Sequence, residues 1–156
     1  MALSATIVCN NILRRSFMEN IVVTPMKLQK LMYFISCEYV KATDSELLSE
    51  DFCVWQYGPV LPAVYNEFKS FHGNQITAYA KDANGNSFAY DEDTSPNLKA
   101  AINCIWSNFK NKSGIELSRI THEESSGWSK AFLSGQERIT KEQMKADDSY
   151  RKYMRA

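Results

Sequence analysis

The stretch from Thr24 to Lys41, TPMKLQKLMYFISCEYVK, carries the clearest helix signals in the chain. Thr24 is a good N-cap because its side-chain oxygen accepts a hydrogen bond from an early backbone N–H, and Pro25 suits the first helical position because it has no N–H to leave unpaired. At 3.6 residues per turn, apolar side chains fall on two roughly opposite faces. One face carries Leu28, Leu31, Met32, Ile35 and Tyr39, and the other carries Met26, Tyr33, Cys37 and Val40. A helix that is apolar on two sides must be packed on two sides, so we expect this helix to be central.

A narrow polar edge lies between the two apolar faces of this helix. It consists of Lys27, Lys30, Glu38 and Lys41, with Phe34 set among the charges. We expect this edge to be the part of the helix that solvent reaches. An aromatic anchor ringed by positive charge suits an acidic, partly apolar protein partner, so Lys27, Lys30 and Phe34 are predicted to bind one. A solvated helix edge is the alternative interpretation.

Most of the remaining chain also shows helical patterns. These stretches have apolar residues at helical spacing, with capping residues or proline near several of their starts. We expect helices over Ser4 to about Met18, over 62–71, from Ser95-Pro96, over Leu117–Glu124, over Trp128–Leu133 and from Thr140 toward Tyr153.

Two stretches favour extended structure instead. Residues 52–60, FCVWQYGPV, alternate and are rich in β-branched and aromatic residues, with a turn expected at Gly58-Pro59. Ile76–Ala80 and Ser87–Tyr90 flank Asn84-Gly85, which is typical of a β-hairpin with a type I′ turn. The chain is therefore predicted to be α+β, mainly α: a single compact helical domain over residues 1–156, built around the helix at about 24–41, with a small antiparallel β-hairpin at about 76–90.

Composition argues against several classes of function. Eighteen Lys and Arg balance eighteen Asp and Glu, so net charge offers no argument for nucleic-acid binding, and none is expected. The four cysteines are scattered without a C-x-x-C pair, which predicts reduced, buried thiols. No stretch resembles a signal peptide or approaches the roughly 20 apolar residues of a membrane span. We expect a cytoplasmic protein that does not bind membranes.

The sequence offers little material for catalysis. It has no phosphate-binding loop and no G-x-S-x-G motif, and it has only two histidines. The most reactive-looking stretch is His122-Glu123-Glu124, where a histidine beside carboxylates could act as a base or bind a metal ion. Adjacent helical residues point about 100° apart, however, so His122 is expected instead to hydrogen-bond the backbone or a carboxylate and lock short helices to the core. We predict no catalytic residue, no metal and no cofactor.

Trp55, Tyr57, Gly58 and Pro59 form an aromatic corner beside a predicted turn. A Gly-Pro turn next to aromatic rings can build a rigid binding pocket. The alternative is a packed turn with Trp55 in the core.

Three motifs, in this order, resemble those of one protein family. They are K-L-Q-K-L-x-Y from Lys27, W-x-Y-G-P-V from Trp55, and T-H-x-E from Thr121 ahead of Trp128. Together they resemble the Panacea domain, the SocA-like antitoxin family of phage-associated proteins, over about Leu13 to Tyr153. The resemblance implies a mainly helical domain that neutralises a toxin encoded beside it, usually by direct contact. One member instead presents its toxin to an ATP-dependent protease.

The family pattern falls on positions in all three motifs of this chain. They are Lys27, Leu28, Lys30, Leu31, Tyr33, Trp55, Tyr57, Gly58, Pro59, Val60, His122 and Trp128. Because the pattern is shared by antitoxins to unrelated toxins, Leu28, Leu31, Tyr33 and Trp128 are interpreted as fold residues. The predicted partner-binding residues are Lys27, Lys30, Phe34, Trp55, Tyr57, Gly58, Pro59 and His122.

The function expected from the sequence is that of an antitoxin from a bacterial or prophage toxin–antitoxin system, which binds a cognate protein toxin directly. One alternative is a proteolytic adaptor that delivers the toxin to an ATP-dependent protease. The other is a metal-dependent or His/Glu enzyme built on His122.

Overall fold

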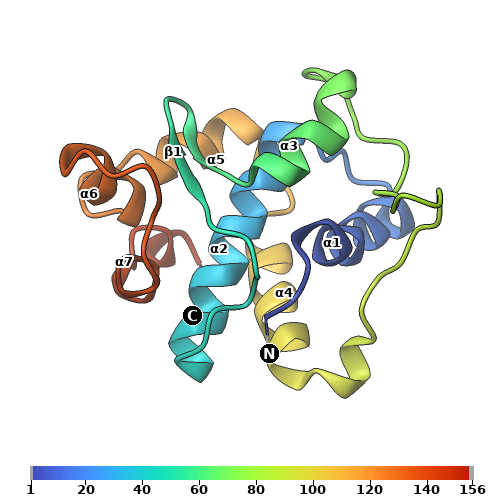
Figure 1. Ribbon diagram of the computed structural model, residues 1–156, viewed down its shortest axis with the longest axis horizontal. Coiled ribbons are helices and arrows are strands. Elements are labelled where there is room, and N and C mark those ends of the chain that lie inside the picture. Colours follow the sequence, from blue (N-terminus) through green and yellow to red (C-terminus); the bar gives the residue numbers. More distant parts are fainter. Residues whose placement is uncertain (1, 155–156) are drawn as a thin grey trace.

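The computed structural model describes residues 2–154, and its helices are arranged around one central helix (Figure 1). The α-helices are α1 (Ala5–Glu19), α2 (Pro25–Thr43), α3 (Pro62–Phe68), α4 (Pro96–Phe109), α5 (Gly114–Thr121), α6 (Gly127–Leu133) and α7 (Lys141–Ala146). Three short 3₁₀ turns lie at Lys69–Phe71, Glu92–Thr94 and Arg151–Tyr153. Strands β1 (Cys53–Trp55) and β2 (Gly58–Val60) pair antiparallel. The fold is α+β and mainly α, as predicted.

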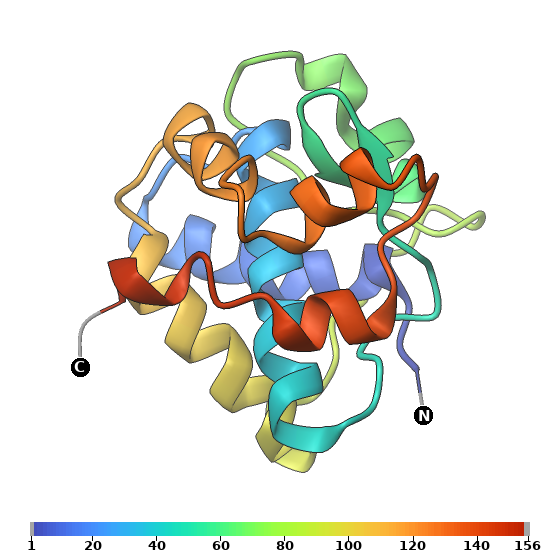
Figure 2. The same cartoon turned by 90° about the vertical axis from the view of Figure 1, so that its left-hand side faces the viewer.

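Helix α2 is the centre of the molecule, as its two apolar faces predicted. The Thr24 side chain caps it by accepting a hydrogen bond from the Lys27 N–H at 3.3 Å. Every residue from Lys27 to Cys37 is buried, because α4 and α5 pack on this helix together with α7, α3, α1 and β2. In Figure 2 the C-terminal segment, residues 147–154, crosses α2 on the side that faces the viewer. The helix is therefore enclosed on all sides along its middle three turns.

The β-hairpin lies at residues 53–60 and not at about 76–90, so the predicted placement was wrong. Cys53 pairs with Val60 and Trp55 with Gly58, which puts the turn at Gln56-Tyr57, two residues before the predicted Gly58-Pro59 turn. The outer edge of β1 is covered by residues 137–139: the Val54 N–H donates to the Glu137 carbonyl at 2.9 Å. This cover leaves no long unpaired strand edge.

The segment from Ile76 to Tyr90 does turn near Asn84-Gly85, but its two arms do not form a strand pair. Asn10 on α1 hydrogen-bonds both backbone groups of Ala80 and the carbonyl of Phe88. Asn11 hydrogen-bonds both backbone groups of Tyr90. These side chains take up backbone groups that a β-ladder would otherwise pair, so the segment is fastened to α1 as irregular structure.

Candidate functional site

The tip of the β1–β2 hairpin is held in place by side chains from three helices. Four backbone carbonyls of residues 55–59 accept hydrogen bonds from side chains of α2, α5 and the α5–α6 region. Trp128 Nε1 lies 2.8 Å from the Trp55 carbonyl, and His122 Nε2 lies 3.0 Å from the Gln56 carbonyl. Ser118 Oγ lies 2.9 Å from the Tyr57 carbonyl, and Lys30 Nζ lies 3.2 Å from the Pro59 carbonyl. The backbone of this turn is thereby fixed, while its side chains are left to point outward.

Helix α2 contributes a further clamp just after the hairpin. The Gln29 side chain donates to the Leu61 carbonyl at 3.1 Å and accepts from the Leu61 N–H at 2.8 Å. Gln29 is buried, and this exchange satisfies both ends of its amide. The result is a fixed junction between β2 and α3.

Gly58 sits where only glycine fits well. Its φ is +116°, in the region that side-chain-bearing residues rarely adopt. A Cβ atom there would lie 2.8 Å from Thr121 Oγ1 and 2.9 Å from Lys30 Nζ. Gly58 and Pro59 are both buried, so their role in the structure is to shape the turn and not to present side chains to a partner.

The predicted exposed edge of α2 is buried at three of the predicted contact residues, and only Glu38 and Lys41 of that edge are partly exposed. Lys27, Lys30 and Phe34 are 5%, 1% and 0% exposed. The Lys27 ammonium donates to the carbonyls of Val22 and Lys110, and burial lowers its pKa. Long lysine stems can line a core when their ammonium groups reach polar acceptors, which the spacing of charges on a helix does not reveal.

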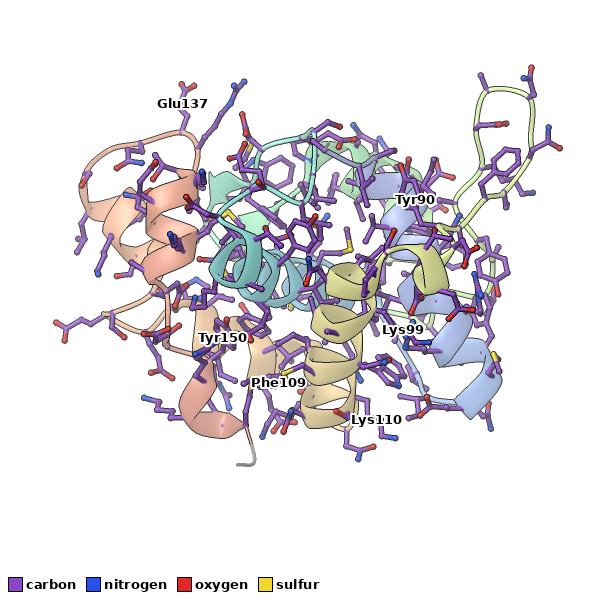
Figure 3. The ribbon with its side chains drawn as sticks, turned by 90° about the horizontal axis from the view of Figure 1, so that it is seen from below. Tyr90, Lys99, Phe109, Lys110, Glu137 and Tyr150 are labelled. Carbon is purple, nitrogen blue, oxygen red and sulfur yellow. The ribbon has the colours of Figure 1, made fainter. Side chains whose placement is uncertain are left out.

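Phe34 is part of the aromatic core. Its ring lies 5.3 Å from the Phe109 ring of α4 and 5.0 Å from the Tyr150 ring of the C-terminal segment, measured between centroids. Figure 3 labels these two neighbours, which approach α2 from different parts of the chain. The charges that flank Phe34 in sequence do not indicate that it is buried, because the rings that pack on it belong to residues more than seventy positions away.

Trp55 and Tyr57 lie on the surface, so the alternative that placed Trp55 in the core was wrong. The two side chains are 39% and 65% exposed. The Trp55 ring packs edge-on against Tyr65 of α3, with centroids 5.2 Å apart, and Tyr65 is itself exposed. We call Trp55, Tyr57 and Tyr65 the aromatic surface.

Helix α6 adds exposed apolar residues next to the hairpin. Phe132 stacks on the buried Trp128 at 5.0 Å, and Trp128 bonds the carbonyl of Trp55. Phe132 and Leu133 are both largely exposed. The prediction did not include Tyr65, Phe132 or Leu133, and no local signal marks them as exposed, since apolar residues at these spacings are also found in buried helix faces.

His122 hydrogen-bonds backbone carbonyls, as one of the two interpretations predicted, but it is exposed and holds the hairpin tip instead of locking short helices to the core. Its Nδ1 lies 2.6 Å from the Ser118 carbonyl and its Nε2 3.0 Å from that of Gln56, while its ring contacts Trp128. Burial opposes ionisation of Glu123, but hydrogen bonds from Lys152 and Tyr153 outweigh it and lower the Glu123 pKa. The histidine and Glu123 therefore face different partners. Within residues 2–154, no group of three or more His, Cys, Asp or Glu is placed to hold a metal ion.

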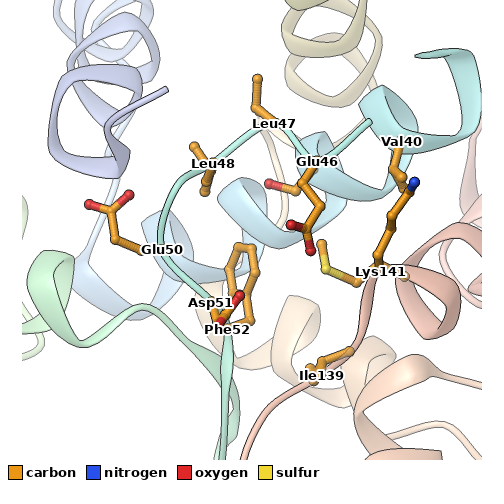
Figure 4. A pocket seen from close by; sticks show the side chains of 11 residues that line it. Val40, Glu46, Leu47, Leu48, Glu50, Asp51, Phe52, Ile139 and Lys141 are labelled. Atoms are coloured by element: carbon orange, nitrogen blue, oxygen red, sulfur yellow. The ribbon is translucent and has the colours of Figure 1, made fainter. Parts of the chain in front are cut away.

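Two hollows lie close to the hairpin. One, of about 210 Å³, lies between α2, the hairpin and α3, and the aromatic surface forms part of its wall. The other, of about 20 Å³, lies between the end of α2, residues 46–52 and α7 (Figure 4). The second hollow has room for about one water molecule, so only the first has the size of a binding pocket.

Comparison with known protein families identifies the family of this chain. A family model described as antitoxin SocA-like, Panacea domain, matches residues 28–129, which is well over half of the chain and runs from the first turn of α2 to the first turn of α6. The chain belongs to this SocA-like antitoxin, Panacea domain family. No curated protein and no solved structure matched the chain.

The Panacea motifs meet at one place in the structure. K-L-Q-K supplies Gln29 and Lys30, W-x-Y-G-P-V forms the hairpin, and the last motif supplies His122 ahead of Trp128. In this chain, the polar groups of these motif residues hold the hairpin backbone. None of the helices in residues 2–154 combines the length and the hydrophobicity needed to span a membrane.

Proposed function

We propose that this chain is the antitoxin of a bacterial toxin–antitoxin pair, which acts in the cytoplasm by binding a cognate protein toxin encoded beside it. Membership of the SocA-like antitoxin family carries the proposal. Membership of such a family implies a toxin partner in general. Our proposal adds that the chain neutralises the toxin by binding it directly and not by delivering it to a protease.

The aromatic surface supports binding at the hairpin. Tyrosine and tryptophan are enriched among the residues that dominate protein–protein affinity, and rigid aromatic anchors lose little entropy on binding. Trp55 and Tyr57 combine an exposed ring with a backbone that Trp128 and Ser118 hold by hydrogen bonds. This is the arrangement expected of a preformed anchor, in place of the lysine edge that the sequence predicted.

The test is co-expression of the chain with the product of the adjacent gene. A product that stops growth alone and is harmless with this chain is expected, together with co-purification of the two proteins. The double variant Trp55→Ala/Tyr57→Ala should fold normally and bind the toxin about 30-fold or more weakly, since truncating one such anchor costs about 2 kcal/mol or more.

Phe88→Ala is the matched control, because Phe88 is an equally exposed aromatic residue on the 76–90 segment. Wild-type affinity in the double variant would move the interface away from the hairpin. The half-life of the toxin in cells separates direct neutralisation from the adaptor alternative: a half-life that shortens only when this chain and an ATP-dependent protease are present would favour the adaptor.

A further inference from the structure

The hollow between α2, the hairpin and α3 has walls suited to an apolar group. Trp55, Tyr57 and Tyr65 line one part of it, and Met26, Val60 and Val64 line another. We call it the aromatic pocket. Its outer wall is made of side chains on the hairpin whose backbone is held by the bonds described above, so the pocket is preformed.

The charge in this pocket is one-sided. Lys30 is one of its lining residues, and none of the residues that line it is acidic. The Lys30 ammonium donates to the Pro59 carbonyl, and no carboxylate of residues 2–154 pairs with it. Burial lowers the pKa of Lys30 to about 7, as expected for a cation that has left water without a counter-charge. An anion bound in the pocket would supply the missing partner.

Besides Lys30 and the tyrosine hydroxyls, the pocket is lined by the buried Gln29 and by His72, which lies exposed at its rim. Gln29 exchanges two hydrogen bonds with the backbone of Leu61 and has no free role toward a ligand. In the buried part of the pocket, Lys30 is therefore the group that would select the ligand's polar end, and its charge selects an anion.

The size of the pocket limits what can enter. Its volume of about 210 Å³ exceeds the roughly 150 Å³ of a cavity that binds benzene. It is below the roughly 300–1,000 Å³ typical of pockets for drug-sized ligands. One large residue fits such a space. Within a polypeptide, only the last residue carries its own backbone carboxylate next to its side chain, and the chain leaves the pocket in one direction only. Capture of C-terminal carboxylates is a known mode of peptide recognition.

We infer that the aromatic pocket binds the C-terminal residue of the toxin, with a large apolar side chain against Trp55 and Tyr65 and its free carboxylate directed to Lys30. The identity of the partner rests on the proposed function. The preference of the pocket for an apolar side chain and a carboxylate does not depend on that function, and it can be measured with short peptides alone.

The experiment titrates the full chain with acetyl-Gly-Gly-Phe carrying a free C-terminal carboxylate and with the same peptide as its C-terminal amide. Binding is followed by calorimetry and by NMR shifts of backbone amides and of the Trp55 indole. The free-acid peptide should bind at least tenfold more tightly than the amide, with the largest shifts on α2, the hairpin and α3.

Lys30→Met keeps most of the length of the side chain and removes its charge. In this variant the ratio of acid to amide affinity should fall to about one, whereas the exposed-lysine control Lys99→Met should keep the wild-type ratio. If Lys30→Met does not fold, the ratio of acid to amide affinity on the wild-type chain still tests whether the pocket selects a free carboxylate.

Equal affinity for acid and amide, no binding of either peptide, or shifts confined to another region would each overturn the inference. Tighter binding of 3-phenylpropionate than of the free-acid peptide would also overturn it, since the pocket would then recognise a small acid and not a chain end. The growth assay separates the two proposals. If the peptide binds but growth is not rescued, the inference about the pocket is supported and the antitoxin function is contradicted. If growth is rescued but no peptide binds, the antitoxin function is supported and the inference about the pocket is contradicted.

Discussion

Lys27 and Lys30 show at the residue scale how a charged side chain becomes part of a core. Each is buried, and each ammonium donates to backbone carbonyls: Lys27 to Val22 and Lys110, and Lys30 to Pro59. A carbonyl satisfies a donor without neutralising its charge, so the cost of burial remains and lowers the pKa of both groups.

Lys30 makes the stability of the protein depend on pH in a predictable direction. Its pKa falls from 10.5 in the unfolded chain to about 7 in the folded one. Between these values the unfolded state binds more protons, so the free energy of unfolding should rise with pH from about 7 toward 10.5. The rise from pH 7 to pH 9 should be about 2 kcal/mol, since one pKa unit corresponds to about 1.4 kcal/mol.

Denaturant unfolding of the wild type and of Lys30→Met at both pH values measures this effect. The difference between the two proteins isolates Lys30 from the other titrating groups. Parallel pH profiles would show that Lys30 stays charged when the protein folds.

Substituting Gly58 should destabilise the fold through two separate effects. Gly58→Ala places a Cβ at a φ of +116° and within 3 Å of Thr121 Oγ1 and of Lys30 Nζ. Backbone strain alone costs about 1–3 kcal/mol, and the displaced neighbours add to it. Gly85→Ala is the control because Gly85 also has positive φ but has open space around it.

Thermal and denaturant midpoints of the two alanine variants should therefore separate strain from crowding. We expect the larger loss of stability in Gly58→Ala. Equal losses would mean that Thr121 and Lys30 move aside freely.

At the scale of elements, the chain has two candidate hairpins and forms a β-ladder in one of them. The 53–60 segment pairs with itself and with residues 137–139, while the 76–90 segment is bonded to α1. The difference lies in which partners are near: two adjacent asparagines on α1 supply a ready alternative to strand pairing for Ala80 and Tyr90.

Asn10→Ala should loosen the 76–90 segment. It leaves the buried N–H and carbonyl of Ala80 without their partner, at a cost of about 1–3 kcal/mol for each unsatisfied group. Amide hydrogen exchange should accelerate at Ala80 more than at the core of α2. Asn84→Ala, at the exposed tip of the same segment, serves as the control and should leave exchange at Ala80 unchanged. Unchanged protection in Asn10→Ala would show that packing, not the asparagine, holds the segment.

At the scale of the whole molecule, Asp147 joins the C-terminal segment to the centre. Its carboxylate is buried and accepts hydrogen bonds from the Tyr33 hydroxyl of α2, the Gly127 N–H of α6, and both the N–H and the hydroxyl of Ser149. Four donors around one carboxylate compensate for its removal from water. The segment then continues to Tyr150, whose ring covers Phe34.

Asp147→Ala should be among the most damaging single substitutions in the chain. It leaves several buried donors in three parts of the structure without an acceptor, so the free energy of unfolding is expected to fall by about 3 kcal/mol or more. Asp148→Ala is the neighbouring control, because Asp148 is exposed and its ion pairs lie at the surface. Its effect should stay within about 1 kcal/mol. A similar loss in both variants, measured by denaturant unfolding, would contradict the anchoring role.

The local sequence determined where most of the helices begin and that α2 is central; α5 is an exception, since it begins at Gly114 and not at the predicted Leu117. The Thr24 cap with Pro25, the Thr140 capping box and the two apolar faces of α2 depend on residues within a few positions of each other, and the structure retains all three. The three family motifs could likewise be recognised in the chain itself.

Only the tertiary structure decided which residues of α2 meet solvent and which hairpin forms. The ammonium of the buried Lys30 is satisfied by the Pro59 carbonyl, and Phe34 is covered by Phe109 and Tyr150. Trp55 lies at the surface on a backbone that Trp128 bonds. Each of these partners is between 29 and 116 positions away in the chain, counted from the residue numbers. Periodicity reports which face of an element is apolar, whereas exposure depends on acceptors and cover supplied by distant elements, and no local pattern encodes those.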